Sequence, residues 1–396
     1  MSAAISVVVM PGPEAPLQVR STPLPEVEPG GVLLRTLGSE VCGTDVHLWH
    51  GQLSGVPYPI TPGHVSVGQV AALGPGEAPR DVDGMPVRLG QVVTFLDVYG
   101  TCGRCWYCTV AHASTRCPQR QVYGVTMCAD DGLFGGWGEY IYLAPGVHIV
   151  PLPEELDWRA FLAGGCGMPT ALHAVTLGEI GFGDTVVVQG AGPVGLCAAV
   201  LAQLRGAGRV IVIGGPQVRL AAARRFGADT VIDIGESTAE ERIERVRALT
   251  GGRGADVTIE ATGVPGAVPE GMRLTRDAGR YIVVGQYTDA GDTSLNPHLD
   301  LNRKHLCVRG CWGSDAGHVW RSVRVMARYA GLFPWTELIS REYSLDQAQS
   351  ALEAVARQEV VKALIVPGRS PDEKPSRRRV PWNRLSGGQF RSTYAR

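Results

Sequence analysis

The chain has 396 residues, of which 44% are hydrophobic and 19% are charged, a composition typical of globular proteins and long enough for two domains. Its net charge of −1 argues against nucleic acid or a membrane surface as partner of the whole chain. The longest apolar run, 193–204, is much shorter than the ~20 residues that span a bilayer, and the N-terminus lacks a basic-then-apolar signal segment. We therefore expect a cytoplasmic protein whose ten cysteines are free thiols or metal ligands.

Residues 1–160 read mostly as β-structure. Short apolar runs at 31–36, 92–95 and 139–143 are separated by clusters of glycine, proline and aspartate. Such spacing favours an antiparallel, partly barrel-like domain.

The sequence pattern changes after about residue 165, where apolar strands alternate with helical segments. This pattern is βαβ, and it predicts a doubly wound parallel sheet of the Rossmann type. The predicted strands are 185–189, 209–213, 230–233, 256–260 and 279–285.

The last part of the chain divides into two segments. Residues 313–366 look helical and end in an apolar strand at 360–366. Residues 367–396 carry eight Lys or Arg and two acids, a local charge of +6, with little apolar content. We expect this basic tail to be disordered.

A glycine-rich loop follows the first strand of the parallel sheet. Gly190, Gly192 and Gly195 fit the pattern G-x-G-x-x-G, and Pro193 and Val194 complete it before an Ala/Leu-rich helix. In this setting the glycines permit a tight turn, close approach of a pyrophosphate, and close packing of helix on strand. The helix N-terminus offers unpaired N–H groups to the phosphates. A glycine turn without a ligand is the alternative.

The end of the next strand bears on the choice of cofactor. An NAD site usually carries Asp or Glu there, bonding the adenosine ribose. Here Gly214 and Gly215 follow the strand, and Arg219 lies nearby in sequence, where it could pair with a 2′-phosphate. The sequence thus favours NADP(H) over NAD(H), although Arg219 could also be an exposed residue of the first helical turn.

Two sets of metal-ligating residues stand out. Cys102, Cys105 and Cys108 form two overlapping C-x-x-C units, and Cys117 follows; four closely spaced thiols suit a closed structural zinc site. A redox dithiol is the rival interpretation. The second set, Cys42, His64 and Cys166, is scattered, and its spacing alone does not establish a site. If the fold joined them, two cysteines and a histidine would suit a catalytic zinc with an open fourth position.

These residues together resemble the zinc-dependent medium-chain dehydrogenase/reductases, the alcohol dehydrogenase superfamily. The matching pieces occur in the family's order over nearly all of residues 1–366: C-G-T-D-V-H at 42–47, G-H at 63–64 with Gly68, the four cysteines, C-G-M-P-T-A-L-H at 166–173, and the glycine loop. The resemblance implies a GroES-like catalytic domain (1–165 with 313–366), a Rossmann domain (166–312), and a homo-oligomer, dimeric or tetrameric.

The same resemblance implies roles for individual residues. Cys42, His64 and Cys166 would hold the catalytic zinc, where the substrate oxygen takes the open position. Thr44 would accept the alcohol's proton and His47 would pass it to solvent. Asp45 would orient the ligand imidazole. The alternatives are a local backbone hydrogen bond for Thr44, a surface histidine for His47 and a helix cap for Asp45.

The resemblance also implies roles for two further residues, and the sequence differs from the usual family pattern in two places. Val284 would lie beside the nicotinamide, and Lys362 would reach the pyrophosphate. The cysteine segment has eight residues between its third and fourth thiols where the family usually has seven. Many relatives carry a glutamate after the ligand histidine, and Val65 cannot coordinate a metal, so we expect a fourth position filled by water or substrate alone.

The predicted function is hydride transfer between a nicotinamide cofactor and a zinc-bound alcohol or carbonyl substrate. One alternative is a zinc-free enone or quinone reductase of the same superfamily, although such relatives lack both cysteine sets. Another is a nucleotide-binding protein without activity. Trp49, Phe95 and Trp312 are candidates for the substrate pocket.

Overall fold

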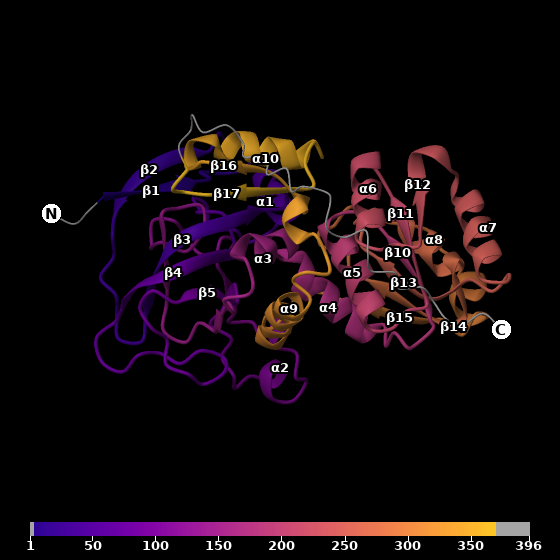
Figure 1. Ribbon diagram of the computed structural model, residues 1–396, viewed down its shortest axis with the longest axis horizontal. Helices are drawn as coiled ribbons and strands as arrows, with labels where there is room; N and C mark the ends of the chain where they lie inside the picture. The colour runs from indigo at the N-terminus through magenta and orange to yellow at the C-terminus, as the bar shows by residue number, and fades with distance from the viewer. Residues whose placement is uncertain (1–3, 370–396) are drawn as a thin grey trace.

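The computed structural model describes residues 4–369 and contains two large sheets with helices between them (Figure 1). The N-terminal sheet has seven strands, in the order β16-β17-β3-β4-β5-β9, with β8 paired to β3. Its strands are β3 (Val32–Val41), β4 (Ser66–Leu73), β5 (Val92–Phe95), β8 (Tyr140–Leu143), β9 (Ile149–Pro151), β16 (Ile339–Tyr343) and β17 (Lys362–Ile365). Two small two-stranded sheets accompany it: β1 (Ala4–Val9) with β2 (Gln18–Pro23), and β6 (Val98–Tyr99) with β7 (Gln121–Val122).

Strand β3 is the centre of this sheet. It is buried along most of its length, because β4 and β8 pair with it and β17 pairs with its last residues. It runs directly into α1 (Gly43–Trp49), which Cys42 caps by accepting the N–H of Thr44. The end of β3 thus delivers Cys42 to the junction of strand and helix.

The C-terminal segment returns to the N-terminal sheet. Strand β17 pairs antiparallel with β3, placing Leu364 opposite Glu40. The expected strand at 360–366 is therefore present, and α10 (Ala348–Ala356) packs beside it. The chain's last described strand lies next to the strand that ends at Cys42.

The second sheet is parallel throughout, in the order β12-β11-β10-β13-β14-β15, so a Rossmann fold is confirmed. The strand order reverses between β10 and β13, where parallel sheets bind ligands at their carboxyl ends. Its strands are β10 (Thr185–Gln189), β11 (Arg209–Gly214), β12 (Thr230–Asp233), β13 (Ala255–Glu260), β14 (Thr275–Val283) and β15 (Cys307–Gly310). Its helices are α5 (Pro193–Leu204), α6 (Gln217–Arg225), α7 (Ala239–Leu249) and α8 (Ala267–Leu274).

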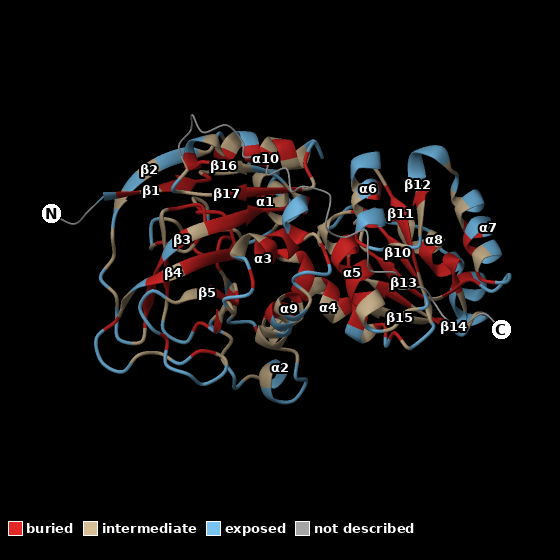
Figure 2. Cartoon of the chain, viewed as in Figure 1, coloured by how far each residue is buried: buried red, intermediate tan, exposed pale blue. Residues whose placement is uncertain are grey.

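Three helices lie between the two sheets: α3 (Trp158–Gly164), α4 (Gly167–Leu177) and α9 (Ala316–Arg328) (Figure 1). Their buried faces and the first Rossmann strands form the largest apolar core (Figure 2). A Cβ atom at Gly167 would lie 3.0 Å from the carbonyl carbon of Pro193. Helix α4 therefore brings the segment after Cys166 against the glycine loop.

Within residues 4–369, no single helix is long and apolar enough to cross a membrane, and only the bent pair α3 and α4, at 54°, passes that test by length and composition. Most of the predicted basic tail lies outside the described residues. Of its first residues, Arg369 forms an ion pair of 3.0 Å with Glu342.

Candidate active site and metal centre

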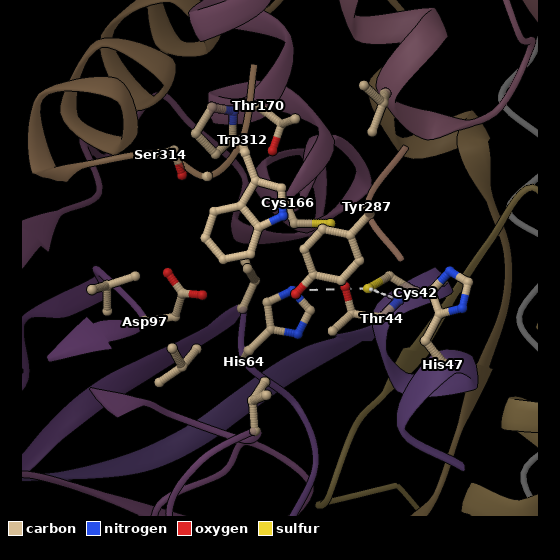
Figure 3. Close-up of a pocket in the computed structure, with 18 of the residues that line it drawn as sticks. Cys42, Thr44, His47, His64, Asp97, Cys166, Thr170, Tyr287, Trp312 and Ser314 are labelled. Atoms are coloured by element: carbon tan, nitrogen blue, oxygen red, sulfur yellow. Dashed lines mark hydrogen bonds between the residues drawn. The ribbon is translucent and has the colours of Figure 1, made fainter. Parts of the chain in front are cut away.

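The fold brings together the three scattered residues Cys42, His64 and Cys166. One ligand atom from each lies within 4.8 Å of the others, and His64 Nε2 is 3.8 Å from Cys42 Sγ. Cys42 lies between β3 and α1, His64 precedes β4, and Cys166 precedes α4, so the cluster joins separate parts of the chain (Figure 3). Cys42, His64 and Cys166, whose spacing in the sequence did not establish a metal site, therefore come together in a group that could hold a metal ion.

The turn before His64 depends on glycine. Gly63 has φ of +94°, and a Cβ atom there would lie 2.5 Å from Ser39 Oγ and from Trp137 Cδ1. Only glycine adopts this conformation without cost in so tight a space. The turn thereby directs the imidazole of His64 from the strand end into the cluster.

The donor set fits a zinc ion. The hydrogen bond from Cys166 and the positive charge of His64 hold the pKa of Cys42 well below the usual thiol range, against the effect of burial. Thiolate and imidazole are the ligands that zinc prefers, and two cysteines with one histidine leave a position for substrate. The chemistry and the geometry of these residues therefore both suit a catalytic zinc.

Asp45 caps α1. Its Oδ2 accepts the backbone N–H of Cys42 at 2.8 Å, which completes a capping box with the Cys42 side chain. Among the described residues, Asp45 Oδ1 and His64 Nδ1 are buried without a hydrogen-bond partner. The structure thus gives Asp45 the capping role that the sequence left open. Among the described residues, Asp45 forms no hydrogen bond with His64 that would orient the imidazole.

Lys362, expected at the pyrophosphate, has a partner that the sequence did not indicate. Lys362 is 1% exposed and forms a buried ion pair with Glu40, behind the cysteines of the cluster. The pairing of β17 with β3 causes this placement, because it sets the first residue of β17 beside the end of β3. Lys362 therefore neutralises a carboxylate beside the metal-ligating cysteines.

Thr44, His47 and Tyr287 all line the cavity beside the cluster (Figure 3). Burial raises the pKa of Tyr287 to about 12, and interaction with the Thr44 side chain lowers it slightly. His47 Nδ1 lies 2.5 Å from Gln52 Oε1, and its ring is 6.2 Å from that of Tyr287. A hydroxyl, an imidazole and a second hydroxyl therefore share one wall.

The cavity has a volume of about 720 Å³ and lies between the two sheets. Phe95 and Trp312 line it as expected, whereas Trp49 packs in a separate apolar cluster. Val284 also lines it, 8% exposed, one residue beyond β14. Two ionisable residues on its wall were not predicted from sequence patterns: Asp97, whose pKa is raised by burial, and Arg120.

The indole of Trp312 is fixed from both domains. Tyr287 stacks on it at 5.9 Å, and the guanidinium carbons of Arg116 and Arg120 lie 4.0 Å and 4.6 Å from its ring centroid. Arg116 directly precedes Cys117, so the cysteine segment supplies part of the support for the pocket. No sequence pattern marked Tyr287 or these arginines, because their meeting depends on the fold.

The four-cysteine segment also gathers into one cluster. The sulfur atoms of Cys102, Cys105, Cys108 and Cys117 all lie within 4.8 Å of one another. The short helix α2 (Trp106–Thr109) and the 3-10 turn Ser114–Arg116 accommodate the additional residue before Cys117. N–H groups of Arg104 and Cys105 lower the pKa of Cys102 to about 6. Four sulfurs at this spacing suit a closed tetrahedral zinc site.

The three glycines of the loop differ in what surrounds them. A Cβ atom at Gly190 would lie 2.5 Å from the carbonyl oxygen of Ala261, and one at Gly195 would lie 1.9 Å from that of Gly190. These two are required by packing. At Gly192 the nearest atom would be 3.9 Å away, so this position opens on free space at the N-terminus of α5. That space is where a pyrophosphate would lie.

The atom nearest to that open position is Nη1 of Arg219. The guanidinium thus lies against the glycine loop, and its Nε is buried with no hydrogen-bond partner among the described residues. Gly214 ends β11 and presents no carboxylate. A Cβ atom at Gly214 would lie 2.8 Å from the Cβ and N atoms of Ala191, so the strand end packs tightly on the loop.

Comparison with known proteins agrees with this architecture. Residues 28–154 match the alcohol dehydrogenase GroES-like domain, and residues 193–328 match the zinc-binding dehydrogenase family. The 5-exo-hydroxycamphor dehydrogenase of Pseudomonas putida is 35% identical over 344 residues, which cover 87% of this chain and 93% of that protein.

Two solved structures are also similar. An alcohol dehydrogenase of Thermotoga maritima superposes with a TM-score of 0.88 at 33% identity, covering 92% of this chain and 100% of that one. A zinc-binding dehydrogenase of Sinorhizobium meliloti, bound to NADP, has a TM-score of 0.80 at 26% identity, covering 92% and 100%. The chain belongs to the zinc-dependent medium-chain dehydrogenase/reductase superfamily. It is an oxidoreductase of the alcohol dehydrogenase type.

Proposed function

We propose that the protein is a zinc-dependent, nicotinamide-linked dehydrogenase that oxidises an alcohol or reduces the corresponding carbonyl compound. The observation that carries the proposal is that Cys42, His64 and Cys166 converge beside Thr44 in a cavity that also reaches Val194 of the glycine loop. The metal-ligating residues, the proposed proton acceptor and part of the cofactor-binding loop thus line one cavity.

Each group has a role in this chemistry. Cys42, His64 and Cys166 would hold the zinc, which supplies a Lewis acid that lowers the pKa of a bound alcohol, and the nicotinamide accepts the hydride. The Thr44 hydroxyl accepts the alcohol proton and is kept in place by Tyr287. His47, held by Gln52, completes the route to solvent. Val284 and the rest of the apolar wall exclude water from the reacting carbon.

The preferred cofactor is NADP(H). Gly214 leaves the strand end without a carboxylate to repel a 2′-phosphate, and the Arg219 guanidinium beside Gly192 offers N–H donors to it. Similar structures include one bound to NADP and one described as an NAD-dependent alcohol dehydrogenase, so the choice rests on Gly214 and Arg219. Gly190, Pro193 and Gly195 shape the turn that receives the pyrophosphate.

The substrate we favour is a compact, largely apolar alcohol or ketone. Phe95, Val125 and Trp312 give the cavity apolar surface, and Thr44, Asp97 and Arg120 are among its polar lining residues. The relative named as a 5-exo-hydroxycamphor dehydrogenase supports a cyclic alcohol of this kind. A homo-oligomer, either a dimer or a tetramer, is proposed from family membership alone.

Metal analysis and a substrate screen test the proposal together. Two zinc ions per chain are expected, and one should be lost in a Cys117→Ser variant, while Cys128→Ser, outside both clusters, should keep both. Cyclic and linear alcohols and ketones, hydroxycamphor included, are then followed by nicotinamide absorbance with NAD and NADP in parallel. Protein without zinc that turns over none of these substrates would contradict the proposal. Activity on an enone that survives chelation would indicate the zinc-free reductase instead.

A further inference from the structure

A fourth potential ligand lies in the catalytic cluster. One carboxylate oxygen of Glu40 belongs to the group of donor atoms from Cys42, His64 and Cys166 that all lie within 4.8 Å of one another. The Glu40 side chain is fully buried. A buried carboxylate needs compensating partners, so its presence among thiolates requires an explanation.

Glu40 reaches the cluster from the strand that faces His64. Its backbone N–H donates to the carbonyl of Val65 at 3.1 Å, so Glu40 lies across the strand pair from the residue that follows the histidine. The Val65 side chain has no donor atom. The carboxylate at this metal centre is therefore supplied by β3, two residues before Cys42.

The surroundings of Glu40 hold the carboxylate close to the metal ligands. Oε1 accepts the backbone N–H of Cys166 at 2.7 Å, and Oε2 pairs with the ammonium of Lys362. Gly165 makes room for it, since a Cβ atom there would lie 2.0 Å from Oε2. Both oxygens thus have a resting position that lies next to, and not in place of, the three ligands.

The charges balance with the carboxylate included. A zinc ion with two thiolates and a neutral imidazole is neutral, and Lys362 offsets Glu40. Buried charges are stable only when they are compensated in this way. Coordination by Glu40 would therefore leave no net charge inside the fold.

We propose that Glu40 is an exchangeable fourth ligand of the catalytic zinc. Glu40 coordinates the metal while the substrate position is free, and it yields that position to the substrate oxygen by returning to Lys362 and the Cys166 N–H. The exchange breaks one bond between carboxylate and metal and forms one to substrate, so no electron or proton leaves the site. The inference rests on the proposed zinc site, and it replaces the expectation of water or substrate alone.

The direct test is a crystal structure of the zinc-loaded protein without cofactor or substrate. We expect a Glu40 oxygen at about 2.0–2.2 Å from the metal, the usual distance for carboxylates on zinc. A water molecule in the fourth position, with Glu40 still bound to Lys362, would overturn the proposal. Protein that binds no zinc at that site would instead contradict the proposed function.

A solution measurement does not depend on activity. With Co²⁺ at the catalytic site, solvent proton relaxation reports whether a rapidly exchanging water lies on the metal. We expect none in the native protein and one in Glu40→Asp, which keeps the charge but is shorter by a methylene. The paired change Glu40→Gln with Lys362→Met removes both charges and should also gain the water. Equal relaxation in all three proteins, at equal cobalt content, would refute ligand exchange.

Discussion

Tyr287, four residues beyond β14, interacts through its side chain with Thr44 in the first turn of α1, and both line the cavity (Figure 3). The pair closes the cavity between the two domains at the point where substrate oxygen is expected. Since the pKa of Tyr287 is raised to about 12, its hydroxyl stays protonated at neutral pH. A protonated hydroxyl beside Thr44 is suited to orienting that side chain by hydrogen bonding.

Substitutions at these two residues separate the roles. Thr44→Val should lower kcat/KM for alcohol oxidation by roughly 100-fold or more, the range of a lost general base, while Thr44→Ser should retain most of it. Tyr287→Phe should lower it by a smaller factor. Steady-state rates from nicotinamide absorbance check this. If Tyr287→Phe is as damaging as Thr44→Val, Tyr287 takes the proton itself.

The glycine loop offers a matched pair of variants. Gly192→Ala places a methyl group in open space, so the melting temperature should not change, whereas the dissociation constant for cofactor should rise roughly tenfold, which corresponds to about 1.4 kcal/mol. Gly195→Ala should instead destabilise the fold by about 1–3 kcal/mol, because its methyl group meets the Gly190 carbonyl. Calorimetry and cofactor titration distinguish the two. Unchanged cofactor binding by Gly192→Ala would show that the pyrophosphate lies elsewhere.

The role of Arg219 predicts a change confined to one cofactor. Arg219→Gln should raise the KM for NADP roughly 10- to 100-fold, the effect of losing a hydrogen bond between charged groups of about 1.5–3 kcal/mol. The KM for NAD should stay within experimental error. Equal losses with both cofactors would mean that Arg219 contacts a part that they share.

The strand end at Gly214 needs its own control. Any side chain there meets Ala191, so Gly214→Ala measures the steric effect and Gly214→Asp adds the carboxylate. Compared with Gly214→Ala, the Asp variant should lose NADP binding and gain NAD binding, because a carboxylate repels a 2′-phosphate and bonds a ribose hydroxyl. Identical cofactor preference in the two variants would show that the adenosine end does not reach β11.

Asp256 predicts how stability changes with pH. Burial raises its pKa, but hydrogen bonds from Arg276 at 2.6 Å and from the N–H of Thr185 at 2.7 Å outweigh this, so its folded pKa lies below the ordinary value. The stabilisation is therefore complete above the unfolded pKa of about 3.9 and is lost as pH falls through the lower folded value.

Asp256→Asn should lower the free energy of unfolding by about 1–3 kcal/mol at pH 7, and by less as the pH falls below about 4. Urea denaturation across this range measures the difference. Asp277→Asn, exposed on β14 next to Arg276, is the control and should have little effect at any pH. A deficit that stays constant at low pH would mean that packing, and not charge, links these strands.

Sequence patterns were most informative where one short segment carries the whole feature. The glycine loop and the four cysteines each lie within one stretch, so spacing alone indicated their chemistry. Cys42, His64 and Cys166 required the resemblance to a family, because only the fold brings them together. Glu40 gave no signal, since a glutamate near the end of a strand usually faces solvent.

The pairing of Lys362 with Glu40 could not be predicted from the sequence, for a physical reason. A lysine that begins an apolar strand can extend to solvent or point into the core, depending on whether the core contains a carboxylate to pair with it. Glu40 supplies that charge, but the two residues are 322 positions apart in the chain. Their contact depends on the pairing of β17 with β3, which no local pattern contains. The same reasoning applies to Tyr287 and to the arginines on Trp312.

The ion pair between Glu40 and Lys362 also orders events during biosynthesis. At about 5–20 residues per second, the ribosome needs roughly 16–64 s to add the residues that separate these two. During that time the carboxylate of Glu40 lacks its counter-ion Lys362, and the N-terminal sheet lacks strands β16 and β17. The metal centre therefore matures late, after nearly the whole chain has been made, and a chain that stops before β17 cannot neutralise it.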